Sequence, residues 1–127
     1  MEKEYLLEDT DFLVSQTDAH GKIVFANEDF CKIAGYTLHE LVGKPHSIVR
    51  HPDMPKEAFQ ALWKTLKGGN IWKGYIKNKT KDGGYYWVFA TVYPNVGYKD
   101  GKSGYISCRR KANAIEIRTA FDHYTKK

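Results

Sequence analysis

Three strand-like segments follow one another closely in the second half of the chain, and they limit the possible folds more than any other feature. Ile71 to Thr80, Tyr85 to Tyr93 and Ser103 to Lys111 are rich in aromatic and β-branched residues, which favour extended backbone. The links between them, Lys81 to Gly84 and Gly97 to Gly101, contain the glycines of tight hairpin turns. Since short links join neighbouring antiparallel strands, this half of the sequence predicts a three-stranded antiparallel meander.

The first half of the chain predicts a hairpin followed by two short helices. Phe12 to Thr17 and Lys22 to Ala26 are short β-type runs joined by a glycine-containing turn. Asn27 follows at a helix N-cap position, where its side chain can accept a hydrogen bond from the first helical turn. Thr37 and Glu40 have the spacing of a capping box. We therefore expect five strands around a middle region of short helices.

A proline-rich loop and a longer helix separate these two halves. Pro45 to Pro55 is too polar and too rich in proline for a regular element, so we expect an ordered loop there. Pro55 suits the first position of the helix that follows. Apolar residues recur at helical spacing in that helix before two glycines end it: Ala58, Phe59, Leu62, Trp63 and Leu66. At the end of the chain, Ala112 to Tyr124 predicts an exiting amphipathic helix, with one apolar stripe: Ile117, Phe121 and Tyr124.

Size and composition indicate a single domain, and the expected strands and short helices make its fold class α+β. The 127 residues are 42% hydrophobic and 28% charged, which is enough for one buried core. We expect an N-terminal cap over residues 1–11, the main domain over residues 12–111 and a C-terminal linker helix over residues 112–127. No apolar run approaches the roughly 20 residues of a membrane span, and no charged-then-apolar leader opens the sequence. The expected location is therefore cytoplasmic, without membrane contact from this segment.

Several classes of chemistry lack their usual sequence signals. Cys31 and Cys108 lie far apart without CxxC spacing, so we expect no metal site and reduced cysteines that pack. No serine or cysteine lies in a nucleophile elbow, and the chain is not expected to be an enzyme. The net charge of +5 favours solubility or an anionic ligand without requiring nucleic acid.

Alternation along Ile71 to Thr80 sorts this strand into two faces. One face contains most of the lysines and is expected to be wet: Ile71, Lys73, Tyr75, Lys77 and Lys79. The other face is expected to point inward: Trp72, Gly74, Ile76, Asn78 and Thr80. Its stacking area and amide suit a planar heteroaromatic ligand, and they equally suit a core tryptophan beside an asparagine bonded to backbone. In the following strand both faces are apolar or aromatic, so its inward face stays open, and outer aromatics would suit a partner protein or a terminal helix.

The segment Arg50-His51-Pro52-Asp53 places a fixed cation, an imidazole and a carboxylate within four residues of a stiff loop. Such a group can bind phosphate or an anionic ring. It can also be a local ion pair between Arg50 and Asp53 with no ligand at all. The residues alone leave both interpretations open.

The order of elements resembles the PAS family over nearly all of Phe12 to Arg110. The residues that support the resemblance are Asn27-Glu28-Asp29-Phe30, Ala34-Gly35-Tyr36, Glu40-Leu41-Val42-Gly43, Gly74, Lys81-Asp82-Gly83 and Tyr86-Trp87. A longer combination is similar to the PAS domain of bacterial aerotaxis receptors: Arg50 to Pro55 within His46 to Phe59, Leu66-Lys67-Gly68, Trp72-Lys73-Gly74 and Lys77-Asn78. The resemblance implies a PAS fold whose short helices enclose a ligand cleft, between flanking terminal helices.

The same resemblance implies a sensor that binds FAD without a covalent bond and reports redox state or oxygen to a signalling partner, such as a chemoreceptor. Carried over position by position, it gives the candidate pocket: Asn27, Arg50, His51, Asp53, Phe59, Trp72, Asn78 and Tyr86. Arg50 and His51 would supply positive charge for a reduced, anionic flavin, and Trp72 would pack on or beside the ring. Asn78 would make a hydrogen bond that changes with redox state.

Other interpretations remain open. Haem is the second ligand candidate, with His46 or His51 as the central histidines. An interaction module with a side-chain-filled pocket, used for PAS homodimerisation, is the competitor from another class. The Asn-Cys-Arg helix of light-sensing relatives is absent, so we do not expect photo-adduct chemistry. Nucleic-acid binding through the lysine face is the third reading, and we expect none.

Overall fold

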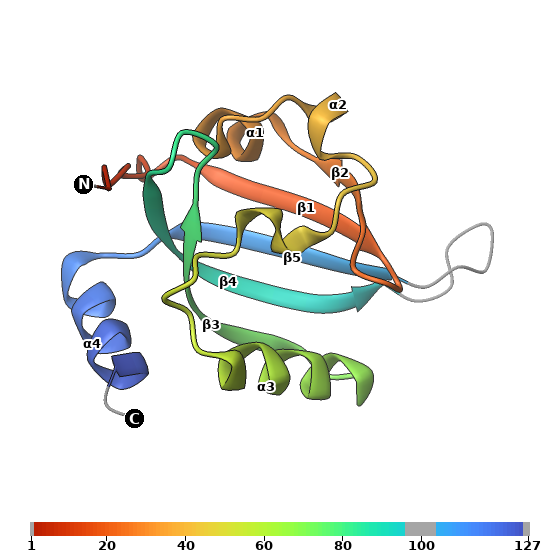
Figure 1. Cartoon of the computed structure of the whole chain (residues 1–127). Helices are drawn as coiled ribbons and strands as arrows, with labels where there is room; N and C mark the ends of the chain where they lie inside the picture. Colours follow the sequence, from red (N-terminus) through yellow and green to blue (C-terminus); the bar gives the residue numbers. More distant parts are fainter. Residues whose placement is uncertain (1, 96–103, 126–127) are drawn as a thin grey trace.

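The chain folds around one antiparallel sheet (Figure 1). The structure is a computed structural model and describes residues 2–95 and 104–125. Its strands are β1 (Phe12–Asp18), β2 (Ile23–Ala26), β3 (Trp72–Lys79), β4 (Tyr85–Asn95) and β5 (Gly104–Lys111), in the order β2-β1-β5-β4-β3. Because β5 pairs with both β1 and β4, the predicted hairpin and meander join into a single sheet. The predicted turn at 97–101 and the predicted strand start at 103 lie outside the described residues.

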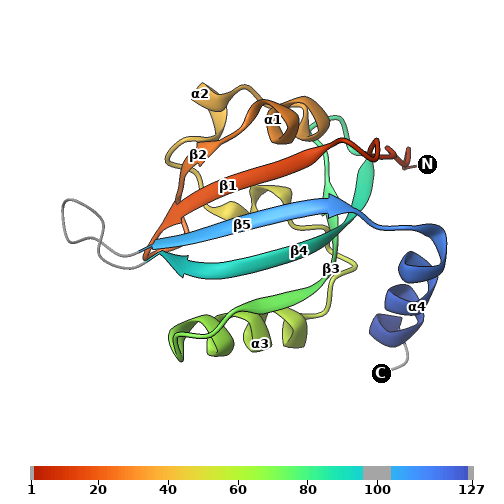
Figure 2. The ribbon, with the colours of Figure 1, turned by 180° about the vertical axis from the view of Figure 1, so that it is seen from behind.

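The helices of the middle region cover one face of the sheet, as the two opposite views show (Figures 1 and 2). They are α1 (Glu28–Ala34), α2 (Leu38–Leu41), the 3₁₀ helix η1 (His46–Val49) and α3 (Lys56–Lys67). A last helix, α4 (Ala114–Thr125), follows β5 and packs on the opposite face, against β3 and β4. This arrangement confirms the expected α+β class. No helix in the described ranges is long and apolar enough to span a membrane.

The helix caps follow the sequence signals. Asn27 caps α1 by accepting a hydrogen bond from the Phe30 backbone N–H at 3.1 Å. Thr37 and Glu40 form the predicted capping box of α2. Both caps satisfy backbone N–H groups that have no partner inside a helix.

The proline-rich segment is more regular than expected. Instead of a loop alone, it contains η1, which begins after Pro45, a residue whose φ of −65° suits the start of a turn. Pro55 also differs by one position, because it is the N-cap of α3 and not its first helical residue. Its ψ of 146° is extended, so the chain enters the helix only at Lys56.

Strand pairing decides the face that the sequence left open in β4. Asn78 of β3 lies opposite Tyr86, and Gly74 lies opposite Ala90, so these residues share the inward face. The other face of β4 points away from the middle helices. There Trp87 is covered by α4 and forms a small second core with Ala112 and Ala120, which fits the expected contact with a terminal helix.

Lys77 corrects the prediction that the lysine face of β3 is wet. Its side chain is only 9% exposed, and its Nζ lies 2.8 Å from Asp53 Oδ2 and 4.4 Å from the centre of the Tyr85 ring. The prediction failed because alternation cannot show that the 50–55 loop and α4 cover this end of β3. Lys73 and Lys79 on the same face are exposed, as expected.

The N-terminal segment is bonded to the start of β4. Tyr5 N–H donates to Tyr85 O at 2.8 Å, and Tyr85 N–H donates to Lys3 O at 2.9 Å. The Tyr5 hydroxyl donates to Asp82, and the Leu7 side chain belongs to the main core. This segment therefore extends the packing of the domain beyond β1.

Candidate functional site

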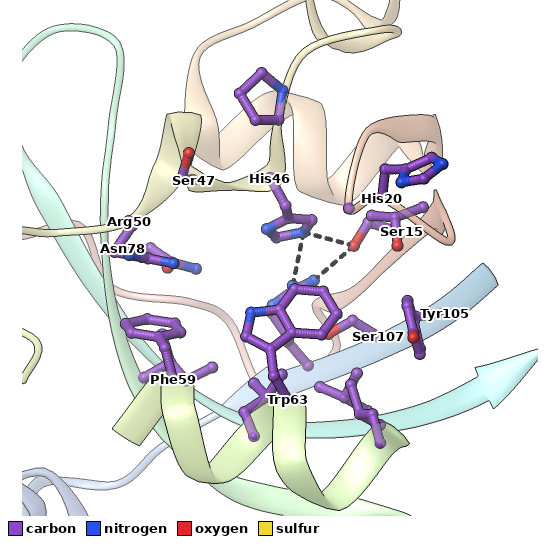
Figure 3. A pocket seen from close by; sticks show the side chains of 18 residues that line it. Ser15, His20, His46, Ser47, Arg50, Phe59, Trp63, Asn78, Tyr105 and Ser107 are labelled. Carbon is purple, nitrogen blue, oxygen red and sulfur yellow. Dashed lines mark hydrogen bonds between the residues drawn. The ribbon is translucent and has the colours of Figure 1, made fainter. Parts of the chain in front are cut away.

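A cavity of about 220 Å³ lies between the inner face of the sheet, η1 and α3 (Figure 3). From α3, the side chains of Phe59, Leu62, Trp63 and Leu66 form an apolar wall, because these positions repeat at helical spacing and face the sheet. Tyr105 of β5 meets Trp63 edge to face, with ring centres 5.2 Å apart. The wall therefore offers aromatic and aliphatic surface to a flat ligand.

The floor of the cavity contains three polar side chains from distant parts of the chain: Ser15 of β1, His46 of η1 and Arg109 of β5. Arg109 Nη1 donates to Ser15 Oγ at 3.0 Å, and Arg109 Nη2 lies 2.9 Å from His46 Nε2. Ser15 Oγ is itself 3.0 Å from His46 Nε2. Since a guanidinium can only donate, His46 Nε2 accepts, and the proton of the neutral ring lies on Nδ1.

Burial and the neighbouring charge set the protonation states on this floor. Burial, and then the Arg109 cation, lower the pKa of His46 to about 3, so the imidazole is neutral near pH 7. Burial also lowers the pKa of Arg109 to about 10, which still leaves the guanidinium charged. The floor therefore has one fixed positive charge beside a neutral acceptor.

Several polar atoms around this floor have no hydrogen-bond partner within the described chain: Thr17 Oγ1, Ser107 Oγ and Arg109 Nε. All three residues line the cavity. Buried polar atoms are nearly always bonded in native proteins, so three orphans at one place indicate a site that a ligand or ordered water completes. The set comprises two hydroxyls and an N–H donor, which suits ligand oxygens and ring nitrogens.

Arg50 lies at the rim of the cavity, exposed, with its guanidinium 4.0 Å from the centre of the Phe59 ring. Its backbone pairs with Asn78 in an isolated bridge, which fixes the loop against β3. Among the described residues that line the cavity there is no aspartate or glutamate. The site is consequently electropositive.

The structure brings three of the eight predicted pocket residues to the cavity: Arg50, Phe59 and Asn78. Tyr86 lies directly behind Asn78, fully buried, with its hydroxyl 3.4 Å from Asn78 Nδ2. Burial raises the pKa of Tyr86 to about 12, so the hydroxyl stays protonated. Tyr86 can orient Asn78 without reaching the cavity itself.

Two other predicted residues have structural partners away from the cavity lining. Asn27 bonds β1 to α1, accepting from Val14 N–H at 3.0 Å and donating to Phe12 O at 2.7 Å. Trp72 packs over Gly74, where an added Cβ would lie 2.6 Å from the indole ring. The predicted row on β3 does face inward, but the tryptophan fills the space above the glycine.

His51 and Asp53 turn away from Arg50 to the opposite side of the loop. His51 is buried, and its Nε2 lies 2.7 Å from Glu2 of the N-terminal segment. Its Nδ1 accepts from the Asp53 backbone N–H at 3.0 Å. Asp53 pairs with Lys77, and this bond holds the pKa of Asp53 below its usual range. The side chains of this motif therefore do not converge on the cavity, and Asp53 is paired with Lys77 and not with Arg50.

Sequence reasoning missed most of the floor. The sequence-based prediction did not single out Ser15, Thr17, Ser107 or Arg109, and it considered His46 only as a haem ligand. The available signal was strand alternation, because Leu13, Ser15 and Thr17 share one face of β1. Their partners in β5 are Arg109, Ser107 and Tyr105, but only the pairing shows that an arginine occupies an inward position.

The fold and the cavity define the class of α+β domains in which short helices close a pocket over an antiparallel sheet. The chain belongs to the PAS fold family, whose model matches residues 23–109.

The relatives agree with this assignment. The aerotaxis receptor of Escherichia coli (strain K12) is 50% identical over 112 residues, covering 87% of this chain and 22% of the receptor. The nitrogen fixation regulatory protein of Klebsiella oxytoca is 30% identical over 105 residues, covering 83% of this chain and 21% of that protein. The chain thus spans about a fifth of the length of these curated relatives.

A solved structure confirms the fold. It is described as "Flavin Analogue Sheds Light on Light-Oxygen-Voltage Domain Mechanism", and it matches with a TM-score of 0.73 and 20% identity. The match covers 88% of this chain and 84% of the other.

Proposed function

We propose that this chain is a sensory PAS domain that holds a flavin, FAD, without a covalent bond in the cavity and reports redox state or oxygen to a signalling partner. The observation that supports it best is the cavity itself, with an aromatic wall, a positive floor and three orphaned polar atoms. A flavin ring is flat and has oxygens and nitrogens along one edge. Its flat faces match the aromatic wall of the cavity, and its polar edge matches the polar, positively charged floor. When bound, the flavin supplies reversible electron acceptance.

The residues of the chain have distinct proposed roles toward that ligand. Phe59 and Trp63 offer stacking area, and Asn78 offers an amide whose direction Tyr86 controls. Arg50 at the rim and Arg109 on the floor supply positive charge. Asn27, Trp72, His51 and Asp53, the other members of the predicted pocket, act through the fold by holding the elements that surround the cavity.

The relatives support the signalling part of the proposal. An aerotaxis receptor and a nitrogen fixation regulatory protein are both several times longer than this chain, so their PAS-like portions work beside other domains. We propose the same here, with a chemoreceptor or a similar signalling protein as the partner, a cytoplasmic location, a possible PAS homodimer and no catalytic activity of its own.

The geometry argues against haem, the alternative ligand. An axial histidine needs a ring nitrogen that is free and faces the cavity. His46 Nε2 is engaged by Ser15 and Arg109, and His51 Nε2 is engaged by Glu2. Axial ligation by either histidine would therefore require breaking a buried contact.

The test is the visible absorption spectrum of the purified protein before and after dithionite, with the released chromophore identified by mass. We expect flavin bands that bleach on reduction and a mass of FAD. Asn78→Ala and Phe59→Ala should each weaken FAD retention at least tenfold, while Lys73→Ala, on the exposed face of β3, should not change it. A Soret band, or no chromophore after incubation with FAD, would contradict the proposal.

A further inference from the structure

Arg109 is a buried cation without a counter-charge. It is 3% exposed, and it takes part in none of the salt bridges found in the described chain. Its bonded partners, Ser15 and His46, are both neutral. The Phe30 ring, 5.3 Å from the guanidinium, adds a cation–π contact. A charge held in this way costs free energy unless a partner compensates it.

Arg109, Ser107 and Thr17 all belong to the lining of the cavity. Its Nε has no partner in the described chain, and the nearby hydroxyls of Ser107 and Thr17 are also orphaned. They occupy neighbouring positions on one face of β1 and β5, since Arg109, Ser107 and Tyr105 lie opposite Leu13, Ser15 and Thr17. One charged donor and two hydroxyls therefore lie in the lining of the same cavity, and none of the three has a hydrogen-bond partner in the described chain.

From this geometry we infer that Arg109, Ser107 and Thr17 form an anion-recognising floor that binds the oxygen-bearing edge of a planar ligand and prefers the ligand's anionic form. The inference rests on the proposed function in that the physiological ligand would be the flavin. The sequence-based prediction gave Arg50 and His51 as the source of positive charge for a reduced flavin. Because His51 is bonded away from the cavity lining, the inference assigns this role to Arg109 of β5 beside Arg50. His46 acts as a positioning residue, because its neutral Nε2 holds Nη2 of Arg109 and leaves Nε free.

The inference is tested with Arg109→Met and Arg109→Lys against a matched control, Arg110→Met. Arg110 is the next residue on β5, faces the other side of the sheet and has a side chain that is half exposed. Dissociation constants are measured for oxidised FAD and for dithionite-reduced FAD in alkaline buffer, where the reduced ring is anionic. Wild type should bind the reduced form more tightly, and Arg109→Met should lower that preference at least tenfold.

Arg109→Lys should retain part of the preference, and Arg110→Met should retain all of it. A tenfold change in the preference corresponds to about 30 mV in the potential of a two-electron couple, which redox titration measures independently. An unchanged preference in Arg109→Met would overturn the inference.

Thermal unfolding of the ligand-free protein separates recognition from a structural role. If Arg109 is compensated only when an anion is bound, Arg109→Met removes an uncompensated charge from the ligand-free protein. The melting temperature of this variant should then equal or exceed that of wild type. A strong decrease in Arg109→Met, with none in Arg110→Met, would mean that Arg109 only holds Ser15 and His46 together, and would contradict the inference.

A second probe keeps the inference independent of flavin. Benzoate and benzamide are planar and nearly isosteric, but only benzoate is an anion. Benzoate should raise the melting temperature of ligand-free wild type and have no effect on Arg109→Met, while benzamide should do less in wild type. If wild type binds no FAD but responds to benzoate in this way, the proposed flavin function fails and the anion floor stands. No difference between the two compounds would overturn the floor.

Discussion

Arg50 and Asp53 lie three positions apart in one loop, yet they serve different parts of the molecule. Arg50 reaches the rim of the cavity, and Asp53 reaches the opposite side, where its carboxylate meets the buried Lys77 ammonium at 2.8 Å. At the scale of single residues, the direction of the side chain decides the role. For this reason we expect substitutions of Asp53 to change the stability of the fold and substitutions of Arg50 to change the binding of the ligand.

Asp53→Asn and Lys77→Met should have unequal effects on stability. Asp53→Asn leaves a buried ammonium without its carboxylate, which should lower the free energy of unfolding by about 1–3 kcal/mol. Lys77→Met removes the buried charge and leaves Asp53 hydrated, so the loss should be below about 1 kcal/mol. Urea denaturation measures both, with Lys73→Met on the exposed face as a control that should change nothing.

The pH dependence of the same pair has a definite sign. Because the bond to Lys77 lowers the pKa of Asp53 in the folded protein, the pair stabilises the fold above the ordinary carboxylate pKa of about 3.9. That contribution is lost as the pH falls through the lowered value. Wild type and Asp53→Asn should therefore converge in stability at acid pH; a constant difference would show that charge is not the cause.

Elements differ in how far their own sequence specifies them. α1 and α2 begin where their capping residues predict, because a cap is a local hydrogen bond. The faces of β4 and β5 could not be assigned locally, since both faces of β4 are apolar or aromatic and β5 has an arginine at an inward position. Pairing with β1 and β3 settles them.

The helix α4 provides the prediction at this scale. Ile117 packs against the small core around Trp87, while Ile115 on the same helix is 80% exposed. Ile117→Ala should lower the free energy of unfolding by about 1–2 kcal/mol, and Ile115→Ala should have almost no effect. Chemical denaturation followed by tryptophan fluorescence compares them. Equal effects of the two substitutions would mean that α4 does not dock on β4 in solution.

At the scale of the whole molecule, the two ends of the chain converge on the start of β4. The N-terminal segment is hydrogen-bonded to Tyr85, and α4 covers Trp87 on the face of β4 that points away from the middle helices. The loop that contributes Arg50 to the cavity contributes His51 and Asp53 to these contacts. The loop therefore contacts both the cavity and the two terminal segments of the described chain.

The N-terminal segment should consequently be part of the folded unit. Leu7 is 4% exposed within the main core, and its neighbour Leu6 is 73% exposed. Leu7→Ala should lower the free energy of unfolding by about 2–4 kcal/mol, whereas Leu6→Ala should change it by less than about 0.5 kcal/mol. Thermal unfolding monitored by circular dichroism tests the pair. A silent Leu7→Ala would place this segment outside the cooperative fold.

The sequence by itself determined the structural features that depend on residues close together along the chain. The capping of α1 and α2, the amphipathic repeat of α3 and the inward row of β3 are set by local hydrogen bonds and by the periods of helix and strand. The apolar stripe of α3 and the inward position of Asn78 followed from these periods, and the order of strands and helices gave the α+β class. Phe59 and Asn78 became pocket candidates through the resemblance to the PAS family.

Only the tertiary structure decided the cavity floor. Ser15, His46 and Arg109 come from β1, η1 and β5, and no local pattern states that β5 inserts between β1 and β4. The same holds for Lys77, which becomes buried only because the 50–55 loop and α4 close over it. A charged residue on a strand is expected to face water. Its burial can be recognised only when the elements packed around it, and its charged or hydrogen-bonded partners, are known.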